Sequence, residues 1–280
     1  MNRSLKKPLV PFAVGVFSLF FFLSTAPADD LDLFRGHKGA VNISGGTAHI
    51  PVMKEVAKRA LTVNPDIQIT IAGGGTGVGI KQVGEQMVQI GNAGRKPTEA
   101  EIKQHGLVLF QWAIDGVGVV VNPKNKVQAL TGSQLRDIYA GKIANWKELG
   151  GADRVINLYT RDEASGTREV FVGKALKKGA VSAKANVVVS NGAMKTAIAN
   201  DPFGIGYVSV GHIDSSVAPV ALDGVAPTEE NVRDGKYKVA RGLFSLTAGQ
   251  PQGLTKAFLD YLFSTSGQRI VIDKGFIPVR

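Results

Sequence analysis

The feature that most constrains this chain is a unit that recurs along it. Each unit is an apolar segment with strand character, a loop of glycine and hydroxyl residues, and an amphipathic helix. The loops lie at 44–48, at 72–79 and after Arg161, and the helix after the second loop is expected from about Ile80. Alternating strands and helices predict an α/β fold built on a parallel sheet. Ligands of such sheets bind beyond the carboxyl ends of the strands, so we expect these loops to meet at one site.

The stretch after Arg161 carries the most chemistry. An apolar run stops at Arg161, and Ser165 and Thr167 are residue types that favour the start of a helix. Gly166 between them lets the backbone approach a ligand closely. A helix start offers unpaired N–H groups and a partial positive charge, and an arginine adds charge-assisted hydrogen bonds. The stretch predicts an oxyanion site. An ordinary capped helix with a solvated Arg161 is the alternative.

The glycine-rich loop at 73–79 is not a recognised nucleotide site. Gly79 is followed by Ile80, where a Walker A loop has lysine, and no frame supplies the glycine spacing of a dinucleotide loop. The loop offers N–H groups to an anion, and a flexible turn is the alternative.

Signatures of catalysis are weak. Ser165 follows Ala164, outside the Gly-x-Ser-x-Gly elbow, and nothing pairs His49 with a nucleophile. A histidine beside an apolar helix is more often structural. Four histidines and no cysteine give no metal-ligand spacing, so neither a metal nor a cofactor is expected. Basic residues are scattered and do not alternate with aromatic ones, which argues against a nucleic-acid partner.

The first residues are typical of a signal peptide. A basic segment around Lys6 precedes a charge-free apolar run at 9–23, and small residues at 26–28 predict cleavage after Ala28. An uncleaved membrane anchor is the alternative, but the run is shorter than the ~20 residues that span a bilayer. Removing residues 1–28 deletes three basic residues and no acid, so the formal charge falls from +10 to +7. The segment therefore predicts a secreted protein.

Six segments together resemble the periplasmic phosphate-binding subunit of phosphate ABC transporters, over most of the chain from about Val41 to Val279. The two most specific are Arg161–Thr167 and the segment around Gly141-Lys142-Ile143 and Trp146. The others are the loop Ser44–Ala48, Gly75-Thr76-Gly77 before Lys81, Ile90–Arg95 and Gly204–Val208.

The resemblance implies a two-lobed clamp of the type II periplasmic-binding-protein kind, with two crossover strands between α/β lobes. Lobe 1 would be 37–116 plus 238–280, and lobe 2 would be 117–237. It implies a monomer that is not an enzyme, binds inorganic phosphate between the lobes and delivers it to a membrane permease. Glu163 would pair with Arg161 and orient it. The phosphate ligands implied are Thr47, Ala48, Thr76, Arg161, Ser165, Gly166 and Thr167.

One position departs from the family pattern. Members often carry an aspartate after the third strand that accepts the proton of hydrogen phosphate, whereas Gly91–Arg95 holds no acid. Asp115, at the first crossover, is the nearest substitute, and a hinge or surface acid is the alternative reading. The missing acid leaves sulfate or molybdate as alternative ligands. A secreted phosphoryl-transfer hydrolase and a structural surface protein are the alternatives from other classes.

Overall fold

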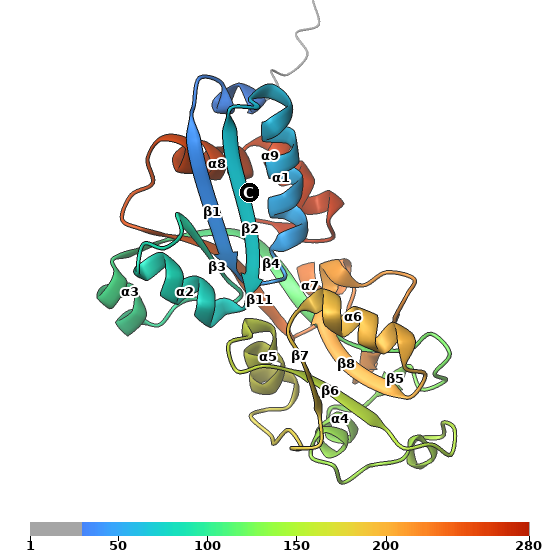
Figure 1. Ribbon diagram of the computed structural model, residues 1–280. Coiled ribbons are helices and arrows are strands. Elements are labelled where there is room, and N and C mark those ends of the chain that lie inside the picture. The colour runs from blue at the N-terminus through green and yellow to red at the C-terminus, as the bar shows by residue number, and fades with distance from the viewer. Residues whose placement is uncertain (1–29, 280) are drawn as a thin grey trace, which may run out of the picture.

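The computed structural model describes residues 30–279, and the predicted signal peptide lies outside them. Two separate stretches of chain build the upper part of the molecule in Figure 1, and the stretch between them builds the lower part. The elements of the upper part, here called lobe 1, are η1 (Asp30–Phe34), β1 (Gly39–Gly45), α1 (Ile50–Val63), β2 (Ile67–Gly74), α2 (Thr76–Gly84), β3 (Ile90–Ala93), α3 (Glu99–His105), β11 (Ala240–Ala248), α8 (Gly253–Phe263), α9 (Thr265–Asp273) and β12 (Ile277–Pro278).

The strand β4 (Leu107–Val121) runs from the upper part into the lower one, here called lobe 2. The remaining elements of lobe 2 are β5 (Ala129–Leu130), α4 (Gly132–Tyr139), η2 (Trp146–Leu149), β6 (Asn157–Arg161), α5 (Gly166–Val170), the π-helical η3 (Phe171–Ala175), β7 (Asn186–Val188), α6 (Asn191–Asn200), β8 (Gly204–Ser209), η4 (Val210–His212), β9 (Ala218–Pro219), β10 (Ala221–Leu222) and α7 (Glu229–Arg233).

The main sheet has the strand order β2-β1-β3-β11-β4-β8-β6-β7. The predicted parallel pairing is found within each lobe, where β1 pairs with β2 and β3, and β6 pairs with β7 and β8. It is wrong in the middle, where β11 pairs antiparallel with β3 and β4, and β4 pairs antiparallel with β8. The reason is that β4 and β11 carry the chain between the lobes in opposite directions. The predicted α/β fold of two lobes with two crossover strands is confirmed.

The strand β4 runs without interruption through Asp115 and Gly116. Its first part pairs with β11 as far as Gly116, and its second part pairs with β8 from Val117 onward. Asp115 lies inside the strand and is paired in register with Arg241 of β11. Asp115 and Gly116 therefore mark the place where the strand changes partner.

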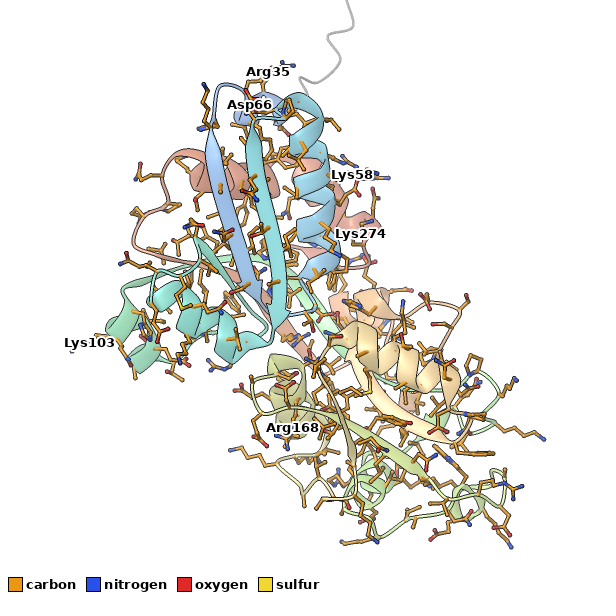
Figure 2. The ribbon with its side chains drawn as sticks, in the orientation of Figure 1. Arg35, Lys58, Asp66, Lys103, Arg168 and Lys274 are labelled. Carbon is orange, nitrogen blue, oxygen red and sulfur yellow. The ribbon has the colours of Figure 1, made fainter. Side chains whose placement is uncertain are left out.

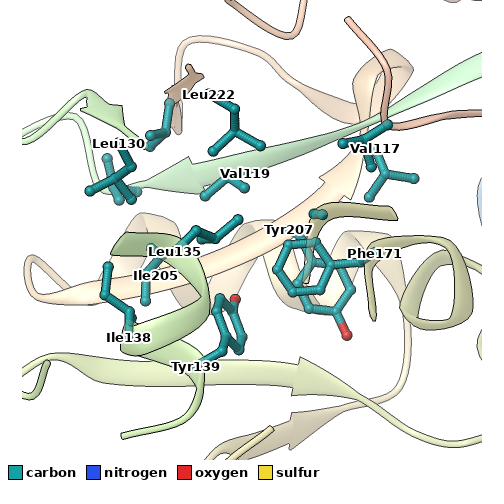
Figure 3. Packing of buried hydrophobic residues seen from close by; sticks show 14 of the residues in the cluster. Val117, Val119, Leu130, Leu135, Ile138, Tyr139, Phe171, Ile205, Tyr207 and Leu222 are labelled. Atoms are coloured by element: carbon teal, nitrogen blue, oxygen red, sulfur yellow. The ribbon is translucent and has the colours of Figure 1, made fainter. Parts of the chain in front are cut away.

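Two large hydrophobic cores lie on either side of that place. The core of lobe 1 packs α1, α8 and α9 against the sheet through residues such as Val52 and Phe258. The core of lobe 2 is seen in Figure 3, where Tyr207 stacks on Phe171 at a centroid distance of 3.9 Å. Because each core is built almost wholly from one side of the crossover, we propose the lobe boundaries 37–116 plus 238–280 and 117–237.

The helix α2 begins at Thr76, four residues before the predicted start at Ile80. The turn is made earlier, by Gly74 and Gly75, whose φ angles of 114° and 89° are open to glycine. A Cβ at Gly79 would lie 2.5 Å from the carbonyl oxygen of Asn92, so glycine there lets the helix lie directly on β3. Glycines that looked like loop residues are thus the first turn of the helix.

The outer surface is polar. The basic side chains of Arg35, Lys58, Lys103 and Lys274 are spread over lobe 1 (Figure 2). The segment 221–237 contains β10 and α7 and contributes Tyr237 to the core of lobe 2. Within residues 30–279, no helix combines the length and apolar character needed to cross a bilayer.

Candidate functional site

A small cavity lies between the lobes, where the predicted loops meet. Its volume is about 10 Å³, far less than the roughly 300–1,000 Å³ of pockets for drug-sized ligands. The predicted site residues all line it, except Asp115. The lining residues are Gly46, Thr47, Ala48, His49, Gly75, Thr76, Gly94, Arg161, Ser165, Gly166, Thr167 and Arg241.

Arg161 is the last residue of β6 and is held by backbone oxygens. Its Nε donates to the carbonyl of Val188 at 3.0 Å, and its Nη2 donates to the carbonyl of Val189 at 3.1 Å. Its own backbone N–H donates to the hydroxyl of Tyr207, which belongs to the core of lobe 2. Nη1 is buried and has no hydrogen-bond partner within residues 30–279. Burial lowers the pKa of Arg161, but a guanidinium stays charged at neutral pH. The arrangement leaves a fixed cationic donor at the cavity.

The prediction that Glu163 pairs with Arg161 is wrong. Glu163 pairs with Arg168, and its side chain is 90% exposed. The turn explains this, because Asp162 accepts from the N–H of Ala164 and the next side chain is left pointing to solvent. Two carbonyls orient Arg161 without adding a negative charge, so its positive charge is not cancelled by a direct carboxylate partner.

Three hydroxyls of the cavity are arranged to donate. The Thr47 oxygen accepts from the N–H and the Nδ2 of Asn191, at 3.2 and 3.0 Å. The Thr76 oxygen accepts from the N–H of Gly94 at 2.9 Å. The Ser165 oxygen accepts from the N–H of Arg168 at 3.2 Å. Since each oxygen already accepts a hydrogen bond, its own hydrogen is free for a ligand.

The helices α1, α2 and α5 begin at this cavity. Thr76 and Gly166 are the first residues of α2 and α5, and Ala48 lies two residues before α1. Helix starts present unpaired N–H groups and a partial positive charge. The three starts therefore add backbone donors and a favourable field for an anion, as the sequence predicted for the loops.

Arg241 is a cavity residue that the sequence analysis did not identify. It lies in β11, and its Nε and Nη2 donate to Asp115 at 3.0 and 2.8 Å. Both side chains are almost fully buried, at 3% and 0% exposure. The alternation of buried and partly buried positions along β11 could have pointed to it. The pattern is hard to see in the sequence, because Arg241, Ser245 and Thr247 are buried at positions where apolar residues are usual.

Asp115 is not placed as predicted. Its carboxylate accepts from Arg241 and from the hydroxyl of Ser209, at 2.8 Å, and it does not line the cavity. Burial raises the pKa of Asp115, while Arg241 and Ser209 oppose that rise. Asp115 therefore acts as the counter-charge of Arg241 and is not placed to contact a ligand in the cavity. The earlier assignment of Asp115 to the site is therefore corrected.

The cavity is lined by hydrogen-bond donors and by the cationic side chains of Arg161 and Arg241. The charge of Arg241 is neutralised by Asp115. No carboxylate lines the cavity. Within residues 30–279, no hydroxyl of the cavity is hydrogen-bonded to the ring of His49, whose polar neighbours are backbone groups of Gly46, Ala93 and Phe244. In the same residues, no group of three or more His, Asp or Glu side chains could hold a metal ion. The arrangement can bind a small oxyanion.

The lobes touch directly beside the cavity. The N–H of Gly77 donates to the carbonyl of Ala164 at 3.1 Å, and Arg95 of lobe 1 pairs with Glu169 of lobe 2. A Cβ at Gly166 would lie 2.2 Å from the Thr76 hydroxyl oxygen. The close approach of Thr76 and Gly166 is possible only because residue 166 is glycine.

A methyl group at that contact should therefore obstruct the site. We expect Gly166→Ala to weaken anion binding by about 1–3 kcal/mol, the usual cost of overpacking. Calorimetric titration with phosphate measures this. Gly173→Ala is the matched control, because a Cβ there meets nothing within 4 Å. Equal phosphate affinity of the two variants would contradict the closed geometry.

Comparison with known proteins gives a consistent result. A family model described as the PBP superfamily domain matches residues 35–266. The phosphate-binding protein PstS of Bacillus subtilis is 41% identical over 244 residues, covering 86% of this chain and 81% of the relative.

Two solved structures add to this. One is a phosphate ABC transporter substrate-binding protein of Clostridium perfringens with bound phosphate, at 36% identity and a TM-score of 0.80, covering 86% of this chain and 100% of the other. An ABC-type phosphate transport receptor of Vibrio cholerae has 32% identity and a TM-score of 0.68, covering 85% and 99%.

Proposed function

Because this chain belongs to the phosphate-binding proteins of the PBP superfamily, we propose that it captures inorganic phosphate between its two lobes for an ABC transporter. The observation that carries the proposal is the cavity of donors, with the unpartnered Nη1 of Arg161 at its wall. The ligands proposed are Thr47, Ala48 and Thr76 from lobe 1, and Arg161, Ser165, Gly166 and Thr167 from lobe 2. An anion bound to both sets stabilises the closed form over the open one, because only closure brings the two sets together.

The proposal includes the absence of catalysis. Phosphoryl transfer needs a positioned nucleophile or water, a base, and groups that neutralise developing charge. The described cavity offers only the last of these. An assay with phosphate monoesters tests this point: we expect no hydrolysis above that of a protein lacking the Arg161 side chain. Hydrolysis that depends on Arg161 would favour the hydrolase reading.

The proposed ligand is phosphate, with sulfate and molybdate as the competing tetrahedral anions. Family membership supports phosphate, and the all-donor lining is compatible with all three. Competition of labelled phosphate against each anion at neutral pH tests the assignment. Displacement of phosphate by equimolar sulfate or molybdate would contradict it.

The partner proposed is the membrane permease of a phosphate ABC transporter, and the protein proposed is a monomer without a cofactor. The permease partner is inferred from members of the family. The monomeric state is supported by the closure of one chain around its own site. Light scattering of the mature protein should give the mass of one chain with and without phosphate. A dimer that forms only on phosphate binding would contradict the single-chain site.

The protein is proposed to act in the periplasm, on the basis of the signal-peptide pattern at 1–28. We expect the exported protein to begin near Asp29. Mass spectrometry of the periplasmic fraction measures this. An intact chain that retains the apolar run at 9–23 would show that the segment is an anchor.

A further inference from the structure

Asn191 is a buried polar residue next to the cavity that does not belong to the proposed ligand set. It is the first residue of α6 in lobe 2, its exposure is 0%, and it does not line the cavity. Its backbone N–H and its Nδ2 both donate to the hydroxyl oxygen of Thr47 in lobe 1, at 3.2 and 3.0 Å. One residue of lobe 2 therefore makes two hydrogen bonds across the lobe boundary to one proposed ligand.

The orientation of the Asn191 amide is fixed by a second contact. The backbone N–H of Ser209 donates to Oδ1 of Asn191 at 3.0 Å. A backbone N–H can only donate, so the side-chain atom that faces Ser209 must be the amide oxygen, and the NH₂ group must face Thr47. The direction of the hydrogen bond at Thr47 thus follows from a contact inside lobe 2.

The same contact links Asn191 to the crossover strands. Ser209 is the last residue of β8, which pairs with β4, and its exposure is 0%. Its hydroxyl donates to Asp115 at 2.8 Å, and Asp115 also accepts from Arg241. Buried polar networks of this kind restrict the orientation of their members. Asn191 is therefore oriented by lobe 2 and the crossover, independently of its contact with Thr47.

Two donors on one hydroxyl decide what that hydroxyl can do. A threonine hydroxyl has two acceptor lone pairs and one hydrogen. Asn191 uses both lone pairs of Thr47, so this hydroxyl is left to donate, and Thr47 lines the cavity. The hydroxyls of Thr76 and Ser165 each accept one hydrogen bond within residues 30–279 and keep a second lone pair. Thr47 is thus the most strictly oriented of the three.

We propose that Asn191 is a positioning residue of the anion site, which fixes the Thr47 hydroxyl as a donor to the bound anion when the lobes close. The inference rests on the proposed function. Asn191 and Thr47 belong to different lobes, so opening of the lobes separates them. Asn191 thereby links closure to the strength of the site without touching the anion.

The test is a double-mutant cycle on phosphate affinity, measured by calorimetric titration. We expect Asn191→Ala to weaken phosphate binding about tenfold, because the Thr47 hydroxyl regains a free lone pair and the freedom to rotate. The same substitution made in a Thr47→Val protein should change the affinity less than about threefold, because the positioned hydroxyl is already absent. In a Thr47→Ser protein, which keeps the hydroxyl, the tenfold effect should return.

A second substitution preserves the packing of the site. Asn191→Asp keeps the size of the side chain and the oxygen that faces Ser209, but it places a carboxylate oxygen where Nδ2 faces Thr47. The hydroxyl can then donate to the carboxylate in place of the anion. The added charge repels phosphate in every background, so the loss should be larger with Thr47 present than in the Thr47→Val protein.

A kinetic measurement and a matched control separate this role from a structural one. Because the Asn191 contact must break when the lobes open, the loss in Asn191→Ala should lie in faster phosphate dissociation, with association changed less than about threefold. Asn122 is a buried asparagine of lobe 2 whose Nδ2 donates to the carbonyls of Ile198 and Ala199, and it does not line the cavity. Asn122→Ala should lower the unfolding temperature and leave phosphate affinity within about twofold.

The outcomes are distinct. Wild-type protein that binds no phosphate would refute the proposed function. Wild-type binding together with unchanged affinity in Asn191→Ala would overturn the role of Asn191 alone. Equal losses from Asn191→Ala with and without the Thr47 hydroxyl would also overturn it, because Asn191 would then act by another route. An equal loss in Asn122→Ala would do the same, since any buried asparagine of lobe 2 would have the effect.

Discussion

Arg161→Ala should reduce phosphate affinity by about 2–5 kcal/mol, which is roughly 30-fold to several thousand-fold. The side chain is 2% exposed, and of its own guanidinium nitrogens only Nη1 has no hydrogen-bond partner within residues 30–279. Removal deletes a desolvated charge-assisted donor and leaves the anion with unpaired charge. Isothermal titration calorimetry with phosphate measures the loss.

Two variants accompany that measurement. Lys81→Ala is the control for general charge, because Lys81 is 72% exposed and lies 4.0 Å from Glu85. Its effect should stay below about 0.5 kcal/mol. Arg161→Lys keeps the charge but not the planar fork that binds the Val188 and Val189 carbonyls, so an intermediate loss is expected. Equal losses in Arg161→Ala and Lys81→Ala would remove Arg161 from the ligand set.

Asp115→Asn should destabilise the phosphate-free protein by about 3–5 kcal/mol. The substitution leaves Arg241 as a buried cation without its counter-charge, since Asp115 is the salt-bridge partner of Arg241. Thermal unfolding measures the change. Added phosphate should restore part of the lost stability, because a bound anion supplies negative charge near Arg241 in the cavity.

The control for this variant is Asp260→Asn, which breaks the exposed ion pair with Lys256 and should change stability by less than about 1 kcal/mol. Because Asp115 does not line the cavity, phosphate and sulfate affinities should change together in Asp115→Asn. A selective gain for sulfate would return Asp115 to the role of proton acceptor. Unchanged stability would show that Arg241 finds another partner.

The convergence of the loops could be predicted from the sequence, and the partners of individual charges could not. Strand, glycine loop and helix in that order place the loops of each lobe at the carboxyl ends of that lobe's parallel strands, which is a consequence of chain direction. Local turn chemistry likewise predicted that a helix starts at Ser165 or Thr167, and Ser165 is the residue that caps α5. These are short-range properties.

The errors concern contacts between residues far apart in sequence. Glu163 is two residues from Arg161, but the carbonyls that hold Arg161 lie 27 and 28 residues away. Arg241 and Asp115 are 126 residues apart and meet because β4 and β11 pair antiparallel. No spacing rule predicts such a pair.

The central claim is that one phosphate binds in the cavity between the lobes. Its most direct test is calorimetric titration of inorganic phosphate into mature protein that has been unfolded, freed of bound anion and refolded. We expect one site per chain, a preference for phosphate over sulfate, and loss of the signal in Arg161→Ala. Absence of phosphate binding by the refolded wild type, or undiminished binding by Arg161→Ala, would contradict the account.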